Sequence, residues 1–224
     1  MKFAVVPVKD LSRAKERLSS ILPQKERTAL AYAMLEDVLN AIRGSRFLNR
    51  LFIVTLDERA IELATTLGIE VIRETKQEGE SASVDFALKI CKDIGAESAL
   101  VIPGDTPLVT PEDIDFILEK EKPYPSVILV PAHNEKGTNA ILRKPPDIIN
   151  SQFGYDSFRK HINEAISKKI PYEVYRIPNI ALDIDEPADI LRFLSKRTNT
   201  KTYEQLLRIG IFYKFKHFLK NGEE

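Results

Sequence analysis

The sequence predicts a layered α/β fold with a largely parallel sheet. Short apolar segments bounded by turn residues alternate with longer segments of helical periodicity, which is the pattern of βαβ units. Strands are expected at Phe3–Val8, Leu51–Leu56, Glu70–Arg73, Ala99–Ile102 and Ser126–Pro131, and helices at about Gln24–Arg43, Glu58–Leu67, Ala82–Ile94 and Pro111–Glu121. A chain of 224 residues suits one such domain with a small appendage.

The alternation changes after Pro131. The residues Asn134–Gly137 are typical of a turn, and they predict that the following strand, Ala140–Arg143, runs antiparallel to the preceding one. Further on we expect a helix at about Asp156–Ser167 and a strand at Tyr172–Arg176. A last core helix starts at Pro187, and Asp185 or Glu186 could cap it.

The C-terminal segment Lys201–Lys220 is predicted to be one amphipathic helix. Its apolar residues recur at helical intervals among lysines: Tyr203, Leu206, Leu207, Ile211, Phe215, Phe218 and Leu219. An exposed apolar stripe usually marks an interface, so the helix should pack against protein, with a homodimer contact favoured over an intrachain one. This divides the chain into a domain at residues 1–197 and a helical extension at residues 198–224.

Composition excludes several classes of partner. The 33 basic and 33 acidic residues cancel, so net charge indicates neither nucleic acid nor an anionic membrane as a partner. No apolar run approaches the roughly 18 residues of a membrane span, and the N-terminus lacks signal-peptide features, so we expect a cytoplasmic protein. The single cysteine, Cys91, reads as a core residue, and the three histidines lack zinc-ligand spacing.

The segment Ile102–Leu108 carries the strongest chemical signal. It follows an apolar strand and places Asp105 at the strand's carboxyl end, where open α/β sheets bind ligands. Gly104 permits an unusual backbone angle, and Pro107 ends strand pairing. Asp105 could instead cap the next helix, but Thr110 is better placed as the N-cap.

A basic loop follows the first strand. Lys9, Arg13, Lys15 and Arg17 lie close together there and could wrap a polyphosphate. The alternative is a solvated helix face, because the segment around Lys15 could be helical. The loop contains neither a Walker motif nor a G-x-G-x-x-G run.

Two later segments add polar groups. Asp183 and Asp185 are two residues apart, so in an extended segment both could address one cation together with Asp105, although either could be a cap. The segment Gly137–Asn139, taken with Phe153–Phe158, offers glycine backbone and hydroxyl donors that suit an anion; glycine-rich turns are also common without such a role.

Taken in order, the motifs V-P-V-K-x-L-x-x-A-K-x-R-L, P-x-D-x-P-L, G-T-N-A-x-L, F-G-x-x-S-F and D-x-D-x-P-x-D resemble the 2-phospho-L-lactate guanylyltransferase family of coenzyme F420 biosynthesis. The similarity runs from Val5 to about Leu194. It implies a nucleotide-diphospho-sugar transferase-like fold, that is, a Rossmann-like three-layer sandwich with a mixed, mostly parallel sheet. The implied reaction joins 2-phospho-L-lactate and GTP to give lactyl-2-diphospho-5′-guanosine and pyrophosphate; related members use phosphoenolpyruvate.

The resemblance also implies roles for residues. The implied catalytic residues are Lys15, Arg17 and Asp105, and the implied nucleotide-binding residues are Pro7, Lys9, Lys15 and Arg17. The implied acceptor-binding residues are Thr138, Asn139, Gly154 and Ser157, and Mg²⁺ is held by Asp105 with Asp183 or Asp185. A nucleotide-binding role for Asp85 is a hypothesis from its hydrogen-bonding chemistry instead. Many members have G-L-N where this chain has Ser83-Val84-Asp85. Asp85 could accept hydrogen bonds from guanine N1–H and N2–H₂.

Other functions stay open at this level. Another nucleotidyltransferase of the same fold, acting on a sugar phosphate or a molybdenum cofactor, is one alternative. A non-catalytic binding module is another, although it would be expected to have lost Asp105, Lys15 or the late acidic pair. The lack of a candidate general base fits transfer to a phosphate monoester, whose second pKa is about 6.

Overall fold

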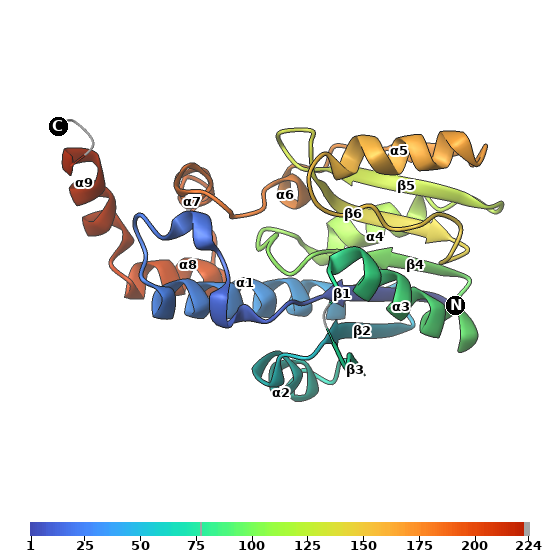
Figure 1. The fold of residues 1–224 in the computed structure, drawn as a ribbon, viewed down its shortest axis with the longest axis horizontal. Coiled ribbons are helices and arrows are strands. Elements are labelled where there is room, and N and C mark those ends of the chain that lie inside the picture. The colour runs from blue at the N-terminus through green and yellow to red at the C-terminus, as the bar shows by residue number, and fades with distance from the viewer. Residues whose placement is uncertain (77, 222–224) are drawn as a thin grey trace.

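A mixed sheet lies at the centre of the molecule (Figure 1). The computed structural model describes residues 1–76 and 78–221, except for the side chains of residues 217 and 219–221. Within this range the strands are β1 (Lys2–Pro7), β2 (Arg50–Thr55), β3 (Glu70–Arg73), β4 (Ser98–Val101), β5 (Ser126–Pro131), β6 (Thr138–Lys144) and β7 (Tyr172–Val174). They form one seven-stranded sheet in the order β3-β2-β1-β4-β6-β5-β7.

Strand β6 runs against the other strands, as the turn at Asn134–Gly137 predicted. It pairs antiparallel with both β4 and β5, whereas β1 pairs parallel with β2 and β4. The expected mixed, mostly parallel sheet is therefore confirmed. Strands β1 and β4 are neighbours whose connections leave in opposite directions, so their carboxyl ends flank the point where the strand order reverses.

Helices cover both faces of the sheet and make it the middle of three layers (Figure 1). The longer ones are α1 (Gln24–Arg43), α2 (Glu58–Thr66), α3 (Glu80–Asp93), α4 (Pro111–Glu119), α5 (Ser157–Ser167), α7 (Pro187–Leu194), α8 (Lys201–Arg208) and α9 (Ile211–Asn221), with shorter turns at η1 (Leu11–Arg13), η2 (Glu16–Leu18) and α6 (Pro178–Ala181). One apolar cluster joins the sheet to α1, α2, α4 and α6, and another joins it to α3 and α5. Cys91 is fully buried in the second cluster, as expected.

Two helix starts next to the expected site have caps of their own. Thr110 is the N-cap of α4 and forms a capping box with Asp113, so Asp105 is not needed as a cap. Glu186 is the N-cap of α7 and forms a similar box with Asp189. Of the two candidates for that cap, Glu186 takes the position, which leaves the carboxylates of Asp183 and Asp185 for other contacts.

Gly104 is required for space rather than for an unusual backbone angle. It is not among the described glycines with positive φ. A Cβ atom at Gly104 would lie 2.9 Å from Cδ1 of Leu35, on helix α1. The expectation about its backbone angle is therefore wrong, because the close approach of the loop to α1 is what favours glycine.

The C-terminal segment forms two helices instead of one. Gly210 has a left-handed φ of 71° directly after α8, a common way for a helix to end, and α9 starts at the next residue. Leu206, Ile211 and Phe215 are buried in an apolar cluster shared with α1 and α7. The segment therefore packs within its own chain, while Phe212 and Tyr213 stay exposed at 60% and 69%. The predicted Leu219 lies outside the described side chains.

The boundary at residue 197 falls between α7 and α8. Helix α8 nevertheless packs on α1. The backbone N–H groups of Lys201 and Thr202 each donate a hydrogen bond of 2.8 Å to the Asp37 carboxylate of α1. The division into domain and extension remains a prediction. Among the described helices, none combines the length and apolarity that crossing a bilayer requires.

Candidate active site

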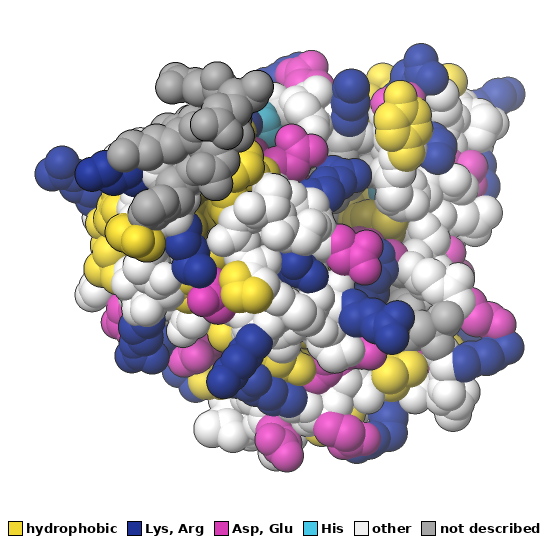
Figure 2. Space-filling view, turned by 60° about the vertical axis from the view of Figure 1, so that its left-hand side comes forward, with side chains coloured by type: hydrophobic (Ala, Val, Ile, Leu, Met, Phe, Trp, Pro, Cys, Tyr) yellow, Lys and Arg dark blue, Asp and Glu magenta, His cyan; other side chains and the backbone are white. Residues whose placement is uncertain are grey.

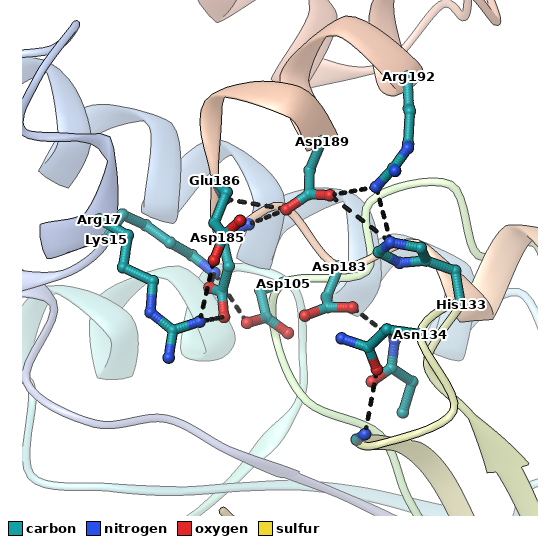
Figure 3. Close-up of polar contacts among 12 residues, drawn as sticks. Lys15, Arg17, Asp105, His133, Asn134, Asp183, Asp185, Glu186, Asp189 and Arg192 are labelled. Carbon is teal, nitrogen blue, oxygen red and sulfur yellow. Dashed lines mark hydrogen bonds and ion pairs between the residues drawn. The ribbon is translucent and has the colours of Figure 1, made fainter. Parts of the chain in front are cut away.

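Lys15 is the centre of the site (Figure 3). Its ammonium Nζ lies 2.8 Å from Oδ2 of Asp105 and 2.7 Å from Oδ1 of Asp185. The side chain of Lys15 is only 8% exposed, against 31% for Asp105 and 40% for Asp185. A buried cation thus joins the loop after β1, the loop after β4 and the loop before α7.

The basic loop is not a helix face in solvent. Lys15 has a left-handed φ of 57°, and the loop around it consists of two short 3-10 turns, η1 and η2. Helices anchor it: Asp57 at the start of α2 accepts a hydrogen bond from Leu11 N at 2.9 Å, and the Thr28 hydroxyl of α1 donates to Leu11 O. Because a left-handed conformation costs energy for a lysine, this anchoring is what holds Lys15 inward.

The two acidic segments are held together by their backbones. Ile184 N donates to Asp105 O at 3.2 Å, which fixes the late D-x-D segment against the loop after β4. The carboxylate of Asp189, in the first turn of α7, accepts from the backbone N–H groups of Asp185 and Glu186. Asp189 is in turn paired with Arg192 at 3.0 Å. Figure 3 shows this support beside the acids.

Asp183 lies on the other side of Asp105 from Lys15 (Figure 3). Its Oδ1 accepts a hydrogen bond from Nδ2 of Asn139 at 3.0 Å, and the same amide donates to Ile180 O at 2.9 Å. Asn139, which was expected to bind acceptor, therefore positions Asp183 in this structure. Acceptor binding by Asn139 stays a prediction.

The charges of the cluster are unequal. Burial disfavours the ammonium of Lys15, but Asp105 and Asp185 outweigh it and raise the pKa of Lys15 above its ordinary value. Burial also acts on Asp185, where the nearby Lys15 prevails and lowers the pKa. Asp183 has no such partner: burial and the carboxylate of Asp105 raise its pKa to about 6. The cluster thus contains more carboxylates than Lys15 neutralises.

Arg17 stands at the edge of the cluster. Its guanidinium is 3.9 Å from Asp185 and 3.6 Å from Glu186, and its side chain is 68% exposed. These separations exceed hydrogen-bonding distance, so the guanidinium is available to a ligand.

The described residues contain no ready-made metal cluster of three or more Asp, Glu, His or Cys side chains. In this structure the oxygens of Asp105 and Asp185 are paired with Lys15 Nζ. The donor chemistry nevertheless fits Mg²⁺, which prefers carboxylate oxygens and binds through one or two of them plus substrate phosphates. Burial and, after it, the neighbouring carboxylate of Asp105 raise the pKa of Asp183, and a bound cation would favour its ionised form.

A cavity opens beside this cluster. It is lined by Pro7, Val8, Lys9, Leu11, Lys15, Ala31, Met34, Leu35, Glu80, Ser83, Pro103, Gly104 and Asp105. Three of the expected nucleotide-binding residues, Pro7, Lys9 and Lys15, therefore lie on one wall. Lys9 is paired with Glu80 at 3.1 Å across the cavity, and burial raises the pKa of Glu80. On the face drawn in Figure 2, acidic and basic side chains are interspersed. This agrees with the balanced net charge, under which any anion site must come from a local group of side chains.

Asp85 is not among the residues that line this cavity. Its carboxylate accepts hydrogen bonds from Ser151 Oγ at 2.6 Å, from Ser151 N at 3.1 Å and from the fully buried Arg143 at 3.3 Å. These contacts fasten α3 to the segment after β6. Contact between Asp85 and a guanine base remains a prediction.

The hydroxyls of Thr138 and Ser157 lie together, as the predicted acceptor site requires. Ser157 Oγ accepts from Thr138 N at 2.9 Å and is 3.3 Å from Thr138 Oγ1. Gly154 O accepts from Ser157 N at 3.2 Å, and Gly154 has a left-handed φ of 109°, so a turn brings it beside the start of α5. Whether these residues bind an acceptor remains a prediction.

The sequence analysis missed the apolar wall of the cavity, formed by Ala31, Met34 and Leu35 of α1, and the acidic Glu80 opposite. Helical periodicity identified α1 but gave no indication of which turn faces a ligand. It also missed His161, which contacts Thr138 Oγ1. The signal was available, because His161 and Ser157 are one helical turn apart on the same predicted helix.

Comparison with known proteins identifies the family of the chain. The family model described as "Guanylyl transferase CofC like" matches residues 1–222. The chain belongs to this family. The match includes the C-terminal helices, beyond the range Val5–Leu194 on which the resemblance rested. The chain is therefore a nucleotidyltransferase.

Relatives within the family differ in the acceptor they are named for. Phosphoenolpyruvate guanylyltransferase of Rubrobacter xylanophilus is 35% identical, with 85% of this chain and 92% of the relative covered. 3-Phospho-D-glycerate guanylyltransferase of Colwellia psychrerythraea is 34% identical over 83% and 88%. 2-Phospho-L-lactate guanylyltransferase of Methanothermobacter thermautotrophicus is 29% identical over 93% and 92%.

Solved structures confirm the fold. A putative nucleotide-diphospho-sugar transferase from Desulfovibrio desulfuricans G20 superposes with a TM-score of 0.75 at 14% identity, covering 97% of both chains. A nucleotidyl transferase from Methanothermobacter thermautotrophicus gives 0.63 at 16% identity, covering 88% of this chain and 97% of that one. The nucleotide-diphospho-sugar transferase-like fold expected from the motifs is therefore correct.

Proposed function

We propose that this protein transfers the guanylyl group of GTP to the phosphate of a small three-carbon carboxylic acid phosphorylated at C2, with release of pyrophosphate. 2-Phospho-L-lactate and phosphoenolpyruvate are both acceptors of this class. The observation that carries the proposal is the buried Lys15 between Asp105 and Asp185, in the wall of a cavity and close to Asp183.

The reaction needs alignment and charge neutralisation rather than a base. A phosphate monoester has a second pKa of about 6, so the acceptor oxygen arrives ionised at neutral pH. This oxygen forms a bond to the α-phosphorus of GTP, while the bond from the α-phosphorus to the bridging oxygen breaks. Pyrophosphate leaves with the electron pair, and no proton is transferred.

The residues of the cluster suit these requirements. Lys15 is buried and firmly cationic, so it can stabilise negative charge that develops around the α-phosphorus in a site partly shielded from water. Arg17, exposed at the edge, can contact the leaving phosphates with its planar guanidinium. Pro7, Lys9 and the apolar face of α1 form the walls against which the nucleoside would lie.

Mg²⁺ is part of the proposal. Asp105 with Asp183 or Asp185 would hold it, and when bound it would neutralise and orient the phosphates of GTP. The contacts of Lys15 with Asp105 and Asp185 support this assignment, because an ammonium already occupies a position of high negative potential there.

Thr138, Gly154 and Ser157 form the proposed acceptor subsite. Thr138 and Asn139 are consecutive; the first contacts the start of α5 and the second contacts Asp183. The start of β6 thus connects the hydroxyl pair to the carboxylate cluster. We further propose that the protein acts in the cytoplasm, with coenzyme F420 biosynthesis as the destination of its product, and as a homodimer.

The test is a pyrophosphate-release assay that crosses GTP, ATP and CTP with 2-phospho-L-lactate, phosphoenolpyruvate and 3-phosphoglycerate, with and without Mg²⁺. Release with GTP and a C2-phosphorylated acceptor, abolished by chelation, supports the proposal. Release that is fastest with 3-phosphoglycerate would assign the acceptor class of the Colwellia relative instead. No release with any acceptor would refute the acceptor class.

A further inference from the structure

A buried histidine supports the hydroxyl pair of the proposed acceptor subsite. His161 of α5 is fully buried, and its Nδ1 is 3.0 Å from Thr138 Oγ1. Its Nε2 accepts a hydrogen bond from the backbone N–H of Gln152 at 2.9 Å. The rings of Phe153 and His161 pack edge to face, with 5.1 Å between ring centroids. Both ring nitrogens therefore have partners, and the ring is packed against an aromatic neighbour.

These contacts decide which nitrogen carries the proton. A backbone N–H can only donate, so Nε2 must be unprotonated to accept from Gln152. A neutral ring with bare Nε2 has its hydrogen on Nδ1. Nδ1–H can therefore donate to Thr138 Oγ1, with the backbone carbonyl oxygen of Ser157 as a second acceptor, and Thr138 cannot donate to Nδ1. Burial and the positive charge of Arg143 lower the pKa of His161 to about 3, which keeps the ring neutral throughout the physiological range.

The direction of that bond fixes the remaining hydroxyl protons. Thr138 Oγ1 accepts from His161, and Ser157 Oγ accepts from Thr138 N. The two hydroxyls can share one hydrogen bond at 3.3 Å, which uses one of their two protons. Among the contacts of the described residues, none accepts the other proton. At least one hydroxyl is thus a donor without an acceptor, in a place where an anion would supply one.

Resting on the proposed function, we infer that His161 is a positioning residue of the acceptor subsite. By donating to Thr138 Oγ1 it prevents Thr138 from donating to the ring, and so directs the hydroxyl protons of Thr138 and Ser157 toward the anionic acceptor. A histidine of the opposite tautomer would take the Thr138 proton and leave a lone pair facing the anion. The relay is the series of hydrogen bonds from Gln152 N to His161 and from His161 to Thr138. Through it the subsite selects a negatively charged acceptor.

Three substitutions separate the relay from simple packing. Thr138→Val removes the hydroxyl and keeps the shape of the side chain. His161→Phe keeps the ring and removes both hydrogen bonds, whereas His161→Asn retains a donor near the position of Nδ1. The KM for the acceptor and the KM for GTP are measured for each variant and for the Thr138→Val, His161→Phe double variant, with the melting temperature as the check on folding.

We expect Thr138→Val and His161→Phe each to raise the acceptor KM at least about tenfold, as for loss of a hydrogen bond to a charged group, with the GTP KM within about twofold. The double variant should be no worse than Thr138→Val alone, since His161 acts through Thr138. His161→Asn should recover most of the loss. Additive effects, or an unchanged acceptor KM in a folded His161→Phe variant, would overturn the inference while leaving the proposed function intact. An unchanged acceptor KM in Thr138→Val would instead remove the subsite itself.

A spectroscopic measurement tests the tautomer in the unaltered protein. The ¹⁵N shifts of His161 should show a neutral ring with protonated Nδ1 and bare Nε2 at pH 7, both without ligand and with saturating acceptor. Protonation at Nε2, or a charged ring, would overturn the relay whether or not the substituted proteins fold.

Discussion

Nζ of Lys15 lies 2.8 Å from Oδ2 of Asp105, although the two residues are 90 positions apart in the sequence. The contact exists because β1 and β4 are neighbours in the sheet and both loops leave the same edge. It places a buried cation and a carboxylate at the wall of the cavity proposed for GTP. Catalysis and local stability should therefore respond together when either residue is changed.

Asp105→Asn is predicted to lower turnover by at least about a hundredfold with GTP and acceptor at saturation. The substitution keeps the size of the side chain and removes its charge, so a charge-stabilising element of the transition state is lost while the fold remains. Steady-state kinetics and circular dichroism measure the two effects. Asp147→Asn is the matched control, because Asp147 pairs with Lys92 at the surface. Turnover of the Asp105 variant equal to that of this control would refute the catalytic assignment.

Lys15→Met and Arg17→Met should differ in their effect on stability. Loss of Lys15 leaves the partly buried Asp105 and Asp185 side by side without their cation, so we expect a fall in melting temperature at pH 8, partly restored by millimolar Mg²⁺. Arg17 is exposed and its ion pairs are long, so Arg17→Met should melt close to the wild type. Both variants should lose turnover. Equal melting temperatures, with no effect of Mg²⁺ on the Lys15 variant, would contradict the arrangement described.

The neutral His161 should make the protein less stable in acid. Its folded-state pKa is lowered to about 3, against an ordinary value of 6.5, so the unfolded chain binds a proton that the folded protein refuses. The contribution of the neutral His161 to the free energy of unfolding is present above pH 6.5. It is lost as the pH falls toward 3, by about 2 kcal/mol between pH 6.5 and 5. Urea unfolding at both pH values measures it. A folded His161→Asn variant should lose less stability over the same interval, and an identical loss would show that His161 is not the group responsible.

Removal of the chain after Arg197 should lower the melting temperature. The truncation deletes Leu206, Ile211 and Phe215, whose side chains fill an apolar cluster together with α1 and α7. The exposed apolar side chains of this segment, Leu207, Phe212, Tyr213 and Phe218, are candidates for the predicted homodimer contact. Light scattering on the full chain and on a Phe212→Ser variant would test that contact. A truncated protein with the same melting temperature and the same oligomeric state as the full chain would show that the tail contributes neither packing nor an interface.

The fold was predictable because each element carries its own periodicity. Helix α1 and strands β3 and β5 have the bounds expected, and Asn134–Gly137 correctly announced the antiparallel β6. The break between α8 and α9 at Gly210 could not be predicted, because an apolar stripe that continues at helical spacing on both sides of a glycine looks like one helix. Gly210 takes a left-handed φ, a conformation that glycine adopts readily at helix ends and that the apolar periodicity does not record.

The site residues that belong to sequence motifs could be predicted. The features of the site that depend on packing could not. Lys15, Asp105 and Asp185 come from three distant segments, and only their order along the chain, compared with a family, linked them beforehand. The burial of Lys15 depends on a left-handed backbone and on anchors such as Asp57. The contacts of Asp85 with Ser151 and Arg143 depend on the path of the chain after β6, so no spacing rule could show them.

The most direct test of the central claim is ³¹P NMR of the reaction of GTP with a C2-phosphorylated acceptor and Mg²⁺. Attack of the acceptor phosphate on the α-phosphorus predicts two coupled doublets from an unsymmetrical diphosphate, together with pyrophosphate in equal amount. The Asp105→Asn variant should form neither at a comparable rate. Formation of GDP and inorganic phosphate, or of a product without the guanosine moiety, would contradict guanylyl transfer at this site.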